Sequence, residues 1–418
     1  MLEKIKKILV EVLRVLLGLL FIFSGFVKAV DPLGSAYKFH DYFTAFGMPF
    51  MEPLTLPASF ILSAFEFSLG VFILLGIYRK LTSFLILALM CVMTPLTLYL
   101  AIANPVSDCG CFGDALVISN WETFIKNIFV LAAAIVVFIW NRYITPILTN
   151  KSTWLGVLYT YMFIFGLSFY CYQNLPILDF RPYRIGANIP QLMEIPEGAP
   201  HDEFKSIYIY EKDGVKKEFT IDNYPAGDSA WVFVDRITKL VKKGYTPPIH
   251  DFTITTLDGV EITDIILADT SFTFLLISPK LERANDAGFD RVNEIFDYSQ
   301  VFGYQFYCLT ASSHEEIFKW IENACVDFQV CITDETTLKT IIRSNPGLLL
   351  LKSGTIINKW HHRNIPQGDE LSKPLSESEL GQIPPNRDKQ KVIYCILWLV
   401  IPLGLIALLD CLVYRRKK

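Results

Sequence analysis

Six apolar stretches divide this chain, and each is long enough for a helix to cross a lipid bilayer. Five lie in the first 173 residues and the sixth is near the C-terminus, and they comprise residues 8–29, 58–78, 82–103, 121–141, 153–173 and 391–413. A helix needs about 20 apolar residues to cross the hydrocarbon core. Hydrophobic residues make up 52% of the 418 positions, which exceeds the usual share in soluble domains. The sequence therefore predicts a multi-pass membrane protein.

The first stretch follows a basic segment, MLEKIKK, as the core of a signal peptide would. It is long, carries Glu11 and Arg14, lacks a small-residue cleavage site and precedes four more apolar stretches. We therefore expect it to be retained as a membrane helix.

Basic residues near the ends of these stretches all fall on one side. Lysine and arginine next to membrane helices are held on the cytoplasmic side. Across six alternating spans the basic clusters agree, and they comprise Lys4, Lys6 and Lys7; Arg79 and Lys80; Arg142 and Lys151; and Arg415 to Lys418. We therefore expect both termini in the cytoplasm, and the loop after residue 103 and the region 174–390 outside.

The region 174–390 has the composition of a soluble domain. Its 217 residues carry a net charge of −10, whereas the rest of the chain carries +6. This length is sufficient for at least one globular domain with its own core. An acidic outer domain also lacks the basic surface that nucleic-acid binding requires.

Residues 30–57 form an outer loop with aromatic residues at roughly helical spacing. These residues are Tyr37, Phe39, Tyr42, Phe43 and Phe46. The spacing predicts a short helix that either lies at the membrane interface, where aromatic rings are enriched, or packs across the mouth of the bundle.

Residues 204–245 alternate between apolar and polar side chains on both sides of a Lys-Asp-Gly turn. This pattern predicts a β-hairpin followed by a further strand. Pro247 and Pro248 then mark a domain boundary.

From His250 to about Arg363, strands and helices alternate. A hairpin through Asp258 and Gly259 comes first, the buried strands SFTFLLIS, YQFYCLTA and FQVCITD alternate with helices, and an apolar strand after Pro346 leads through a Ser-Gly turn into the last strand. This order, with the DFTITTLDG opening and the SNPGLLLLKSGTIINKW ending, resembles the thioredoxin-like fold of the TlpA and peroxiredoxin type. The resemblance implies a cis proline at Pro346 that faces a substrate or partner.

The usual redox motif of that fold is absent. A redox-active thioredoxin carries Cys-x-x-Cys at a helix N-terminus, which lowers the thiol pKa, whereas this chain reads SPKLERAND there. Cys325 also lies in this segment, and Cys308 and Cys331 lie in apolar strands, where we expect small buried thiols. A bridge between Cys308 and Cys331 would need suitable geometry across neighbouring strands. We expect His361 and His362, just past the last strand, to be loop residues that bind no metal.

The stretch SDCGCFGD, between the third and fourth apolar stretches, is the strongest candidate site. Cys109 and Cys111 are one residue apart, and a disulfide between them would close a tight, exchange-prone ring. Gly110 and Gly113 give the backbone the freedom for such a turn. An exchange-active pair and a structural disulfide that pins the loop are both allowed in an oxidising compartment.

Metal binding is the third interpretation of this loop. A closed zinc site needs four ligands, but beyond the two sulfurs the loop offers only carboxylates such as Asp108 and Asp114. Cys171, near the outer end of the fifth stretch, is the candidate for a third thiol. We therefore expect no metal.

The first four apolar stretches resemble the DoxX and MauE group of small membrane proteins. DCGCFGD followed by NWETFIKNIFVL is close to the MauE version of this group. The other matching positions are Arg14, Gly18, Ser24, Gly25, Lys28, Asp31 and Pro32 in the first stretch, and Glu66, Gly70 and Gly76 in the second. The resemblance implies a thiol-handling maturation role at the periplasmic face of a bacterial inner membrane, alongside a thioredoxin-like partner.

Ionisable residues within the spans are costly and usually face the bundle interior or a partner. Glu66 lies in the middle of the second span and Lys126 on the outer half of the fourth. A pair between them is geometrically plausible, because these two spans run in the same direction. Glu11 and Arg14 lie one turn apart near the inner end of the first span. Such pairs either orient the bundle or line a polar cavity below the cysteines that could hold a quinone head group.

The predicted fold is an α-helical membrane bundle, with a four-helix DoxX/MauE-like core and two further spans, joined to an extracytoplasmic α/β thioredoxin-like domain. The expected units are a transmembrane domain (1–145), a fifth membrane helix (146–175), a β-rich connecting region (176–247), the thioredoxin-like domain (248–365), a linker (366–390), and a C-terminal helix with a basic tail (391–418).

Two functional hypotheses follow. In the first, Cys109 and Cys111 cycle between dithiol and disulfide, the thioredoxin-like domain binds a periplasmic client or redox partner, and Glu66, Lys126, Asp108, Asp114, Arg14 and Lys28 support the pair. In the second, the protein is a non-catalytic assembly protein, its disulfide is structural and the domain only docks partners. Transport of a small solute rests on Glu66 and Lys126 alone. Membrane lipid is a partner in every case.

Overall fold

The computed structural model describes residues 1–106, 108–200, 203–212, 214–220, 223, 231–242, 244–324 and 326–415. Ser107, Cys325 and residues 416–418 of the basic tail lie outside the described residues. Six described helices are long and apolar enough to cross a membrane. They are α1 (Leu2–Val30), α3 (Thr55–Leu75), α4 (Arg79–Ala103), α5 (Asn120–Ile139), α6 (Thr153–Gln173) and α12 (Asp388–Asp410). The prediction of a six-span membrane bundle is confirmed.

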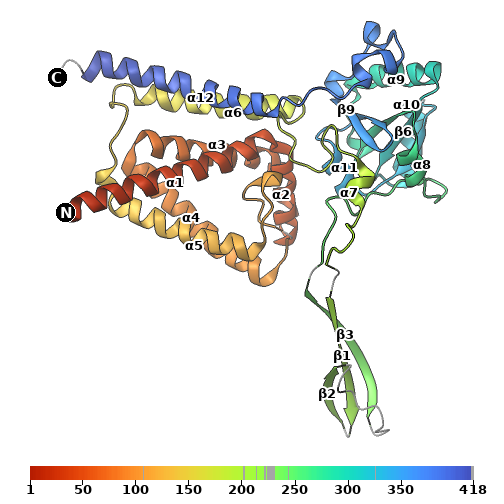
Figure 1. Cartoon of the computed structure of the whole chain (residues 1–418), viewed down its shortest axis with the longest axis horizontal. Helices are drawn as coiled ribbons and strands as arrows, with labels where there is room; N and C mark the ends of the chain where they lie inside the picture. Colours follow the sequence, from red (N-terminus) through yellow and green to blue (C-terminus); the bar gives the residue numbers. More distant parts are fainter. Residues whose placement is uncertain are drawn as a thin grey trace.

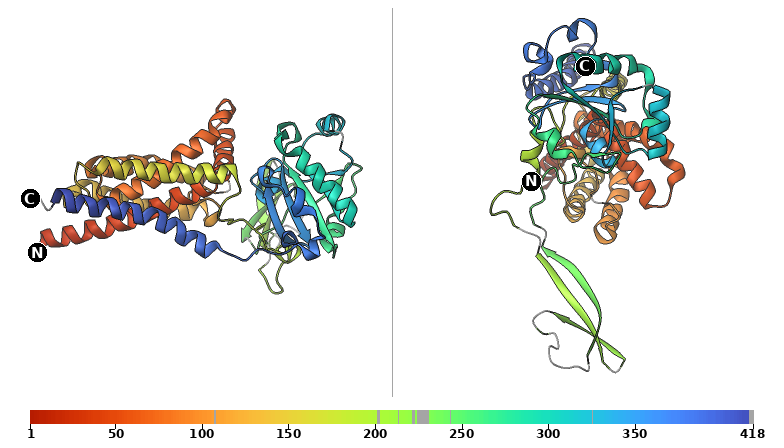
Figure 2. Two further views of the ribbon diagram at one scale, coloured as in Figure 1. Left: turned by 90° about the horizontal axis from the view of Figure 1, so that it is seen from above. Right: turned by 90° about the vertical axis from the view of Figure 1, so that its right-hand side faces the viewer.

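The six long helices run alongside one another, with both termini at one end of the bundle and the α/β domain at the other (Figure 1). Helix α1 packs against α3, α4 packs against α5, and α12 lies along α6 (Figure 2). Helices α1 and α3 approach closely because glycines face the partner backbone. A Cβ at Gly25 would lie 2.4 Å from the backbone nitrogen of Phe67, and one at Gly70 would lie 2.6 Å from that of Ile22.

Local sequence signals set the ends of several helices. Gly76 ends α3 in the left-handed conformation with φ of 69°. Ser119 and Glu122 form a capping box that begins α5. Asp31 ends α1 and also caps α2 (Pro32–Ala45), because its carboxylate accepts a hydrogen bond from Gly34 N at 2.8 Å.

Helix α2 lies across the mouth of the bundle, at the end opposite the termini (Figure 1). It packs against α3, and a 3-10 turn at Pro49–Leu54 leads on into α3. Of the two positions expected for a short helix in residues 30–57, the structure shows the one across the mouth. Its Tyr42 reaches the cysteine loop directly.

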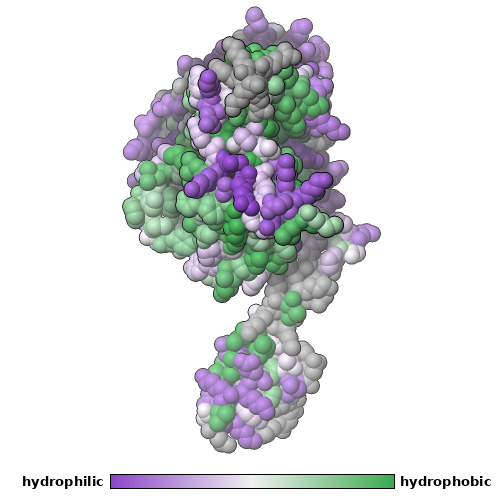
Figure 3. All heavy atoms as spheres, turned by 90° about the vertical axis from the view of Figure 1, so that its left-hand side faces the viewer, coloured by the Kyte–Doolittle hydropathy of each residue, from purple (hydrophilic) through white to green (hydrophobic). Residues whose placement is uncertain are grey.

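The opposite end of the bundle carries the basic clusters. Lys4, Lys6 and Lys7 lie in the first turns of α1, and Arg79 and Lys80 begin α4. Seen from this end, hydrophilic side chains gather on the end face, and apolar ones cover much of the surface around them (Figure 3). The predicted grouping of basic residues at one end of the bundle is therefore present in the structure.

A buried carboxylate fixes the C-terminal helix. Asp410, the last residue of α12, is 1% exposed and contacts the segment just before α6. Its carboxylate accepts hydrogen bonds from the backbone nitrogen of Thr149 at 3.0 Å and from the hydroxyls of Thr149 and Ser152. It thereby satisfies polar groups near the N-terminus of α6, where negative charge is favourable.

Residues 203–242 contain a small antiparallel sheet that projects away from both larger units (Figure 1). Strands β1 (Glu203–Lys212) and β2 (Val215–Thr220) form the expected hairpin, and β3 (Val232–Lys242) pairs with the other edge of β1.

The α/β domain contains a six-stranded sheet in the order β4-β7-β6-β5-β8-β9. Strands β5, β6 and β7 are parallel, and β4, β8 and β9 are antiparallel to their neighbours. The strands are β4 (Thr255–Thr256), β5 (Phe272–Ser278), β6 (Gln305–Thr310), β7 (Gln329–Ile332), β8 (Gly347–Lys352) and β9 (Thr355–His361), and the helices are α8 (Thr263–Ala268), α9 (Phe289–Phe302), α10 (His314–Ala324) and α11 (Glu335–Ile341). An apolar core lies on each face of the sheet. The expected thioredoxin-like fold is confirmed, and the Asn345–Pro346 peptide is cis.

The segments before and after this domain pack against it and contribute residues to its apolar cores. Helix α7 (Ile189–Met193) and Tyr183, expected in a connecting region, contribute Ile189 and Tyr183 to one core. Residues 366–390, expected to be a linker, instead pack against the domain, since Leu371 and Leu375 are buried in the other core. Apolar residues spaced among polar ones in that segment are the reason.

Candidate functional site

The cysteine loop joins α4 to α5 at the mouth of the bundle. Two glycines shape it, because Gly110 and Gly113 have φ of 65° and 50°, values that residues with side chains rarely adopt. Gly113 N donates to Gly110 O at 3.1 Å, and Gly110 N donates to the carboxylate of Asp108 at 2.9 Å. The loop therefore turns tightly around Cys109 and Cys111.

Both cysteines carry free thiols in this structure, and the two side chains are hydrogen bonded to each other. Cys109 is 6% exposed, whereas Cys111 is only partly buried. The hydroxyl of Tyr42, from α2, donates to the carbonyl of Cys109 at 2.7 Å. Cys111 is thus the residue of the pair with the larger exposed fraction.

A buried ion pair forms the floor beneath the loop. The ammonium of Lys28 uses its three hydrogens on Ser24 Oγ at 2.8 Å, Glu66 Oε2 at 2.7 Å and the carbonyl of Cys111 at 2.6 Å. Lys28 and Glu66 are 7% and 6% exposed. The hydroxyl of Ser24 also lies 2.7 Å from the Cys111 carbonyl. The backbone of Cys111 is therefore tied to the ion pair of α1 and α3.

The structure does not contain the plausible pair of Glu66 with Lys126. Glu66 points toward α1 and pairs with Lys28, four residues after Ser24 on the same helix face. Lys126 instead lies with its amine 4.2 Å from the ring centroid of Phe112. The parallel direction of spans two and four made the pair conceivable, but the rotation of each helix decides which neighbour a side chain meets.

The two thiols differ in acidity because their surroundings differ. A hydrogen bond from the Cys109 thiol, with the positive charges of Lys126 and Lys28, lowers the pKa of Cys111 from 9.0 to about 7 despite burial. The hydrogen bond to Cys111 and burial both raise the pKa of Cys109. Burial and the two neighbouring thiols also raise the pKa of Tyr42, which therefore stays a neutral donor.

Alkylation will separate the two thiols by pH. Because Cys111 has the lowered pKa, we expect its reaction with iodoacetamide to rise with pH and reach half its maximum at about pH 7. Cys109 will remain unreactive at this pH because its pKa is raised. Fragment mass spectrometry of the alkylated loop peptide measures each site. Equal labelling of both sulfurs at pH 7 would contradict the assignment.

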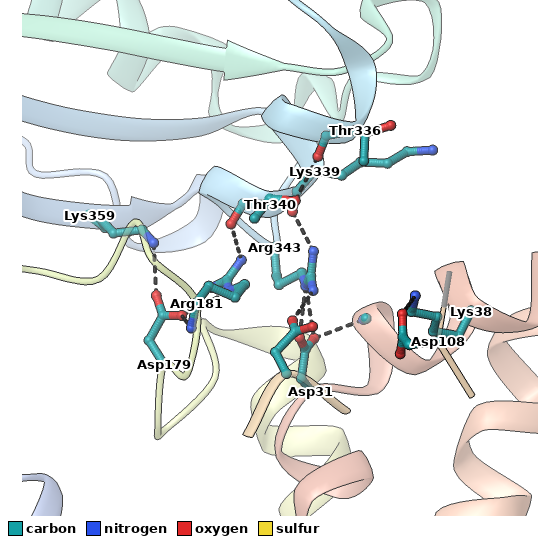
Figure 4. A network of polar contacts seen from close by, with 12 residues as sticks. Asp31, Lys38, Asp108, Asp179, Arg181, Thr336, Lys339, Thr340, Arg343 and Lys359 are labelled. Carbon is teal, nitrogen blue, oxygen red and sulfur yellow. Dashed lines mark hydrogen bonds and ion pairs between the residues drawn. The ribbon is translucent and has the colours of Figure 1, made fainter. Parts of the chain in front are cut away.

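The thioredoxin-like domain is held over the mouth by Arg343, which lies between α11 and β8 (Figure 4). Its Nε donates to both oxygens of Asp31 at 3.0 and 2.9 Å, and its Nη2 donates to Asp114 at 3.0 Å. Asp31 follows α1 and Asp114 follows the cysteine loop. Arg343 is 5% exposed and also lies over the ring of Tyr37, 5.3 Å from its centroid.

Further polar contacts surround this interface. Lys38 from α2 pairs with Asp108 beside the cysteines. Arg181 donates to Thr340 O at 3.0 Å and pairs with Asp179, which also pairs with Lys359 of β9 at 2.9 Å (Figure 4). These contacts attach the segment after α6 to the domain. Arg283 adds an exposed pair with Glu52 at 3.3 Å.

A narrow pocket lies between the loop and this interface. Its lining includes Gly110, Gly113, Asp31, Lys38 and Arg181, and the centre of a water molecule can occupy about 20 Å³ of it. This is room for one or two water molecules.

Several other expected residues lie elsewhere. Arg14 is at the far end of the bundle, where it pairs with Glu11 and donates to the carbonyls of Ile73 and Leu74 at the end of α3, so it does not support the cysteines. Asp108, Asp114 and Lys28 do lie around them. Cys171 is buried in α6.

In the thioredoxin-like domain, Pro346 is buried, and Arg343 of the same loop makes the contact with the bundle. Cys308 and Cys331 are buried in the cores on opposite faces of the sheet, so the structure does not join them. His361 and His362 were expected just past the last strand, but His361 is the last residue of β9 and His362 begins the turn that follows. Both are buried, and their rings lie 4.0 Å apart. Burial lowers the pKa of His361 to about 3 and of His362 to about 4.

Three contributors were missed by sequence reasoning: Arg343, Tyr42 as a loop contact, and Ser24 as part of the floor. The sequence does contain an indication of the role of Arg343. It is a cation three residues before Pro346, in the loop that faces partners in the thioredoxin-like fold. In the sequence, Ser24 stands out only as a position that matches the DoxX and MauE group, and Tyr42 only as one of the aromatic residues at helical spacing. Their contacts with the cysteine loop are hydrogen bonds between segments that are distant in the sequence, and no spacing of residues predicts such contacts.

The fold and the site define a multi-pass membrane protein with a cysteine pair at the mouth of its bundle and a thioredoxin-like domain docked over that mouth. Residues 6–140 match the family described as methylamine utilisation protein MauE, so this part of the chain is similar to the MauE membrane proteins. The expected fusion of a MauE unit with a thioredoxin-like domain is thereby confirmed. Residues 204–243, the projecting sheet, match a family described as a domain of unknown function (DUF8463).

One solved structure is similar to part of the chain. It is the solution structure of a protein assigned as a protein disulfide isomerase from Bacteroides thetaiotaomicron, with 16% identity and a TM-score of 0.22, covering 27% of this chain and 76% of that one. A comparison with curated proteins found no match.

Proposed function

We propose that the protein is a thiol-disulfide oxidoreductase of a bacterial inner membrane, in which Cys109 and Cys111 exchange disulfides with a client or redox partner on the periplasmic side. The observation that carries the proposal is the pair of hydrogen-bonded thiols in one tight loop, held over the buried Lys28–Glu66 pair. The lowered pKa of Cys111 supports it. Exchange needs one thiolate near neutral pH and a second thiol to resolve the intermediate.

The orientation is part of this proposal. The basic clusters and both termini share one end of the bundle, and the cysteine loop shares the other end with the thioredoxin-like domain (Figure 1). Because basic residues are retained inside, this arrangement supports a periplasmic site. The electron acceptor is not part of this proposal.

The thioredoxin-like domain has a different role from a thiol carrier. Its described cysteines, Cys308 and Cys331, are buried, and its loop at Arg343 contacts the membrane domain of the same chain. We propose that it controls access to the cysteine loop and contributes to the surface that a client meets.

Single cysteine variants test the exchange. In Cys109→Ser the remaining Cys111 cannot be resolved, so mixed disulfides with partner proteins will accumulate as bands that a reductant removes. Cys111→Ser will form few of them, because Cys109 is buried and remains protonated.

The alternative, an assembly protein with a structural disulfide, predicts another result. Neither single variant would form mixed disulfides, and the Cys109→Ser, Cys111→Ser double variant would lose only stability. Retained function of the double variant at normal protein levels would overturn the exchange role.

A further inference from the structure

Lys126 stands out among the cations at the mouth of the bundle. Lys28 pairs with Glu66, Lys38 pairs with Asp108, and Arg343 pairs with two aspartates. Within the described part of the chain, no carboxylate pairs with Lys126, whose amine lies over the ring of Phe112 next to Cys111. A lysine half-buried in a membrane helix is costly unless it faces an opposite charge.

The charges that face Cys111 come from every element packed around it. Lys28 of α1 and Glu66 of α3 neutralise each other, and Tyr42 of α2 is neutral. Asp108 of the loop is neutralised by Lys38. Lys126 of α5 is the remaining positive charge, and it lowers the pKa of both thiols.

We propose that Lys126 is the counter-charge of the Cys111 thiolate, and that this pairing makes the Cys109–Cys111 disulfide an oxidant of cysteine pairs in partner polypeptides. The inference rests on the proposed exchange function and gives it a direction. Stabilising the thiolate favours the reduced form of the pair, which makes its disulfide more oxidising.

The exchange then proceeds in two steps. A partner thiolate attacks Cys111, the bond between Cys111 and Cys109 breaks, and Cys109 leaves and takes a proton. The second thiol of the partner, deprotonated, attacks the partner sulfur of the mixed disulfide, and Cys111 leaves as a thiolate beside Lys126. The partner loses two electrons to the pair, and of its two protons one ends on Cys109 and one in solvent.

The test compares the full-length protein with Lys126→Met. If Lys126 stabilises the thiolate, the half-maximum of Cys111 alkylation will move up by about one pH unit, the usual effect of removing one neighbouring charge. In glutathione buffers the variant will be a weaker oxidant, by about fivefold at pH 8 and by less than about twofold at pH 6, because the thiolate is populated only at the higher pH.

Two matched variants control for a structural effect. Lys126→Arg keeps the charge and will restore both the alkylation profile and the glutathione equilibrium. Lys6→Met removes another lysine that lies over an aromatic ring, 5.5 Å from the centroid of Trp140 at the opposite end of the bundle, and will change neither.

The outcomes separate this inference from the proposed function. If Lys126→Met keeps the wild-type pH profile and equilibrium, Lys126 is not the counter-charge and the inference is overturned. If the wild-type pair forms no reversible disulfide in any glutathione buffer, the exchange function itself fails.

Discussion

Replacing Arg343 with methionine will detach the thioredoxin-like domain from the bundle mouth and expose the cysteine loop. Arg343 is almost fully buried and joins Asp31, which follows α1, to Asp114, which follows the cysteine loop. Without it the two carboxylates, which both lie on the bundle side of the interface, are left without their shared cation. Breaking such a pair costs about 3 kcal/mol of docking free energy, at the low end for buried pairs because the Asp114 side chain is 38% exposed.

The measurement is the rate at which a bulky maleimide labels Cys111 at fixed pH. We expect the rate in Arg343→Met to rise at least about tenfold, since about 1.4 kcal/mol of lost docking already changes the open population by that factor. Hydrogen exchange of α2 will increase in parallel.

Arg283→Met is the matched control, because it removes an arginine from the same interface. Its side chain is 72% exposed and pairs with Glu52 at 3.3 Å, so its loss will change little. If Arg343→Met labels no faster than Arg283→Met, Arg343 does not hold the domain over the loop.

Replacing Lys28 with methionine will strongly destabilise the membrane bundle and loosen the cysteine loop. The change leaves the Glu66 carboxylate buried without its cation and removes the hydrogen bond to the Cys111 carbonyl. Breaking a buried ion pair from one side costs about 3 to 5 kcal/mol. Thermal unfolding of the purified protein in detergent measures this loss.

The double variant Lys28→Met, Glu66→Met distinguishes the contribution of the ion pair to stability from that of side-chain packing. Because it leaves no unpaired charge, it will be more stable than Lys28→Met alone, and the two single effects will not add. Strictly additive losses would show that Lys28 and Glu66 contribute independently. Glu11→Met is the control for loss of a carboxylate from an ion pair. Its pair with Arg14 is at the far end of the bundle and the Glu11 side chain is 33% exposed, so we expect a smaller loss of thermal stability than in Lys28→Met.

The sequence was sufficient for the membrane spans and the order of strands, because both depend on local periodicity. Apolar runs of bilayer length predicted the six helices, and the run from SFTFLLIS to the last strand predicted the sheet that contains β5 to β9. The cysteine loop was likewise identifiable, since Cys109, Gly110 and Cys111 are adjacent in the sequence.

The partners of the buried charges could not be read in the same way. Glu66 meets Lys28 and not Lys126 because of how α1, α3 and α5 are rotated about their axes, and the close approach at Gly25 and Gly70 helps to set that rotation. The contact of Arg343 with Asp31 joins residues 312 positions apart, so no spacing rule predicts it. Packing also explains the burial of Leu371 and Leu375 in a segment that looked like a linker.

The most direct measurement of the central claim is the redox state of Cys109 and Cys111 in living cells. A membrane-impermeant alkylating reagent traps free thiols, and mass spectrometry of the loop peptide counts them under oxidising and reducing growth conditions. The exchange role predicts that the pair shifts between dithiol and disulfide, with Cys111 labelled first. A pair that stays fully oxidised, or fully reduced, under every condition would contradict it.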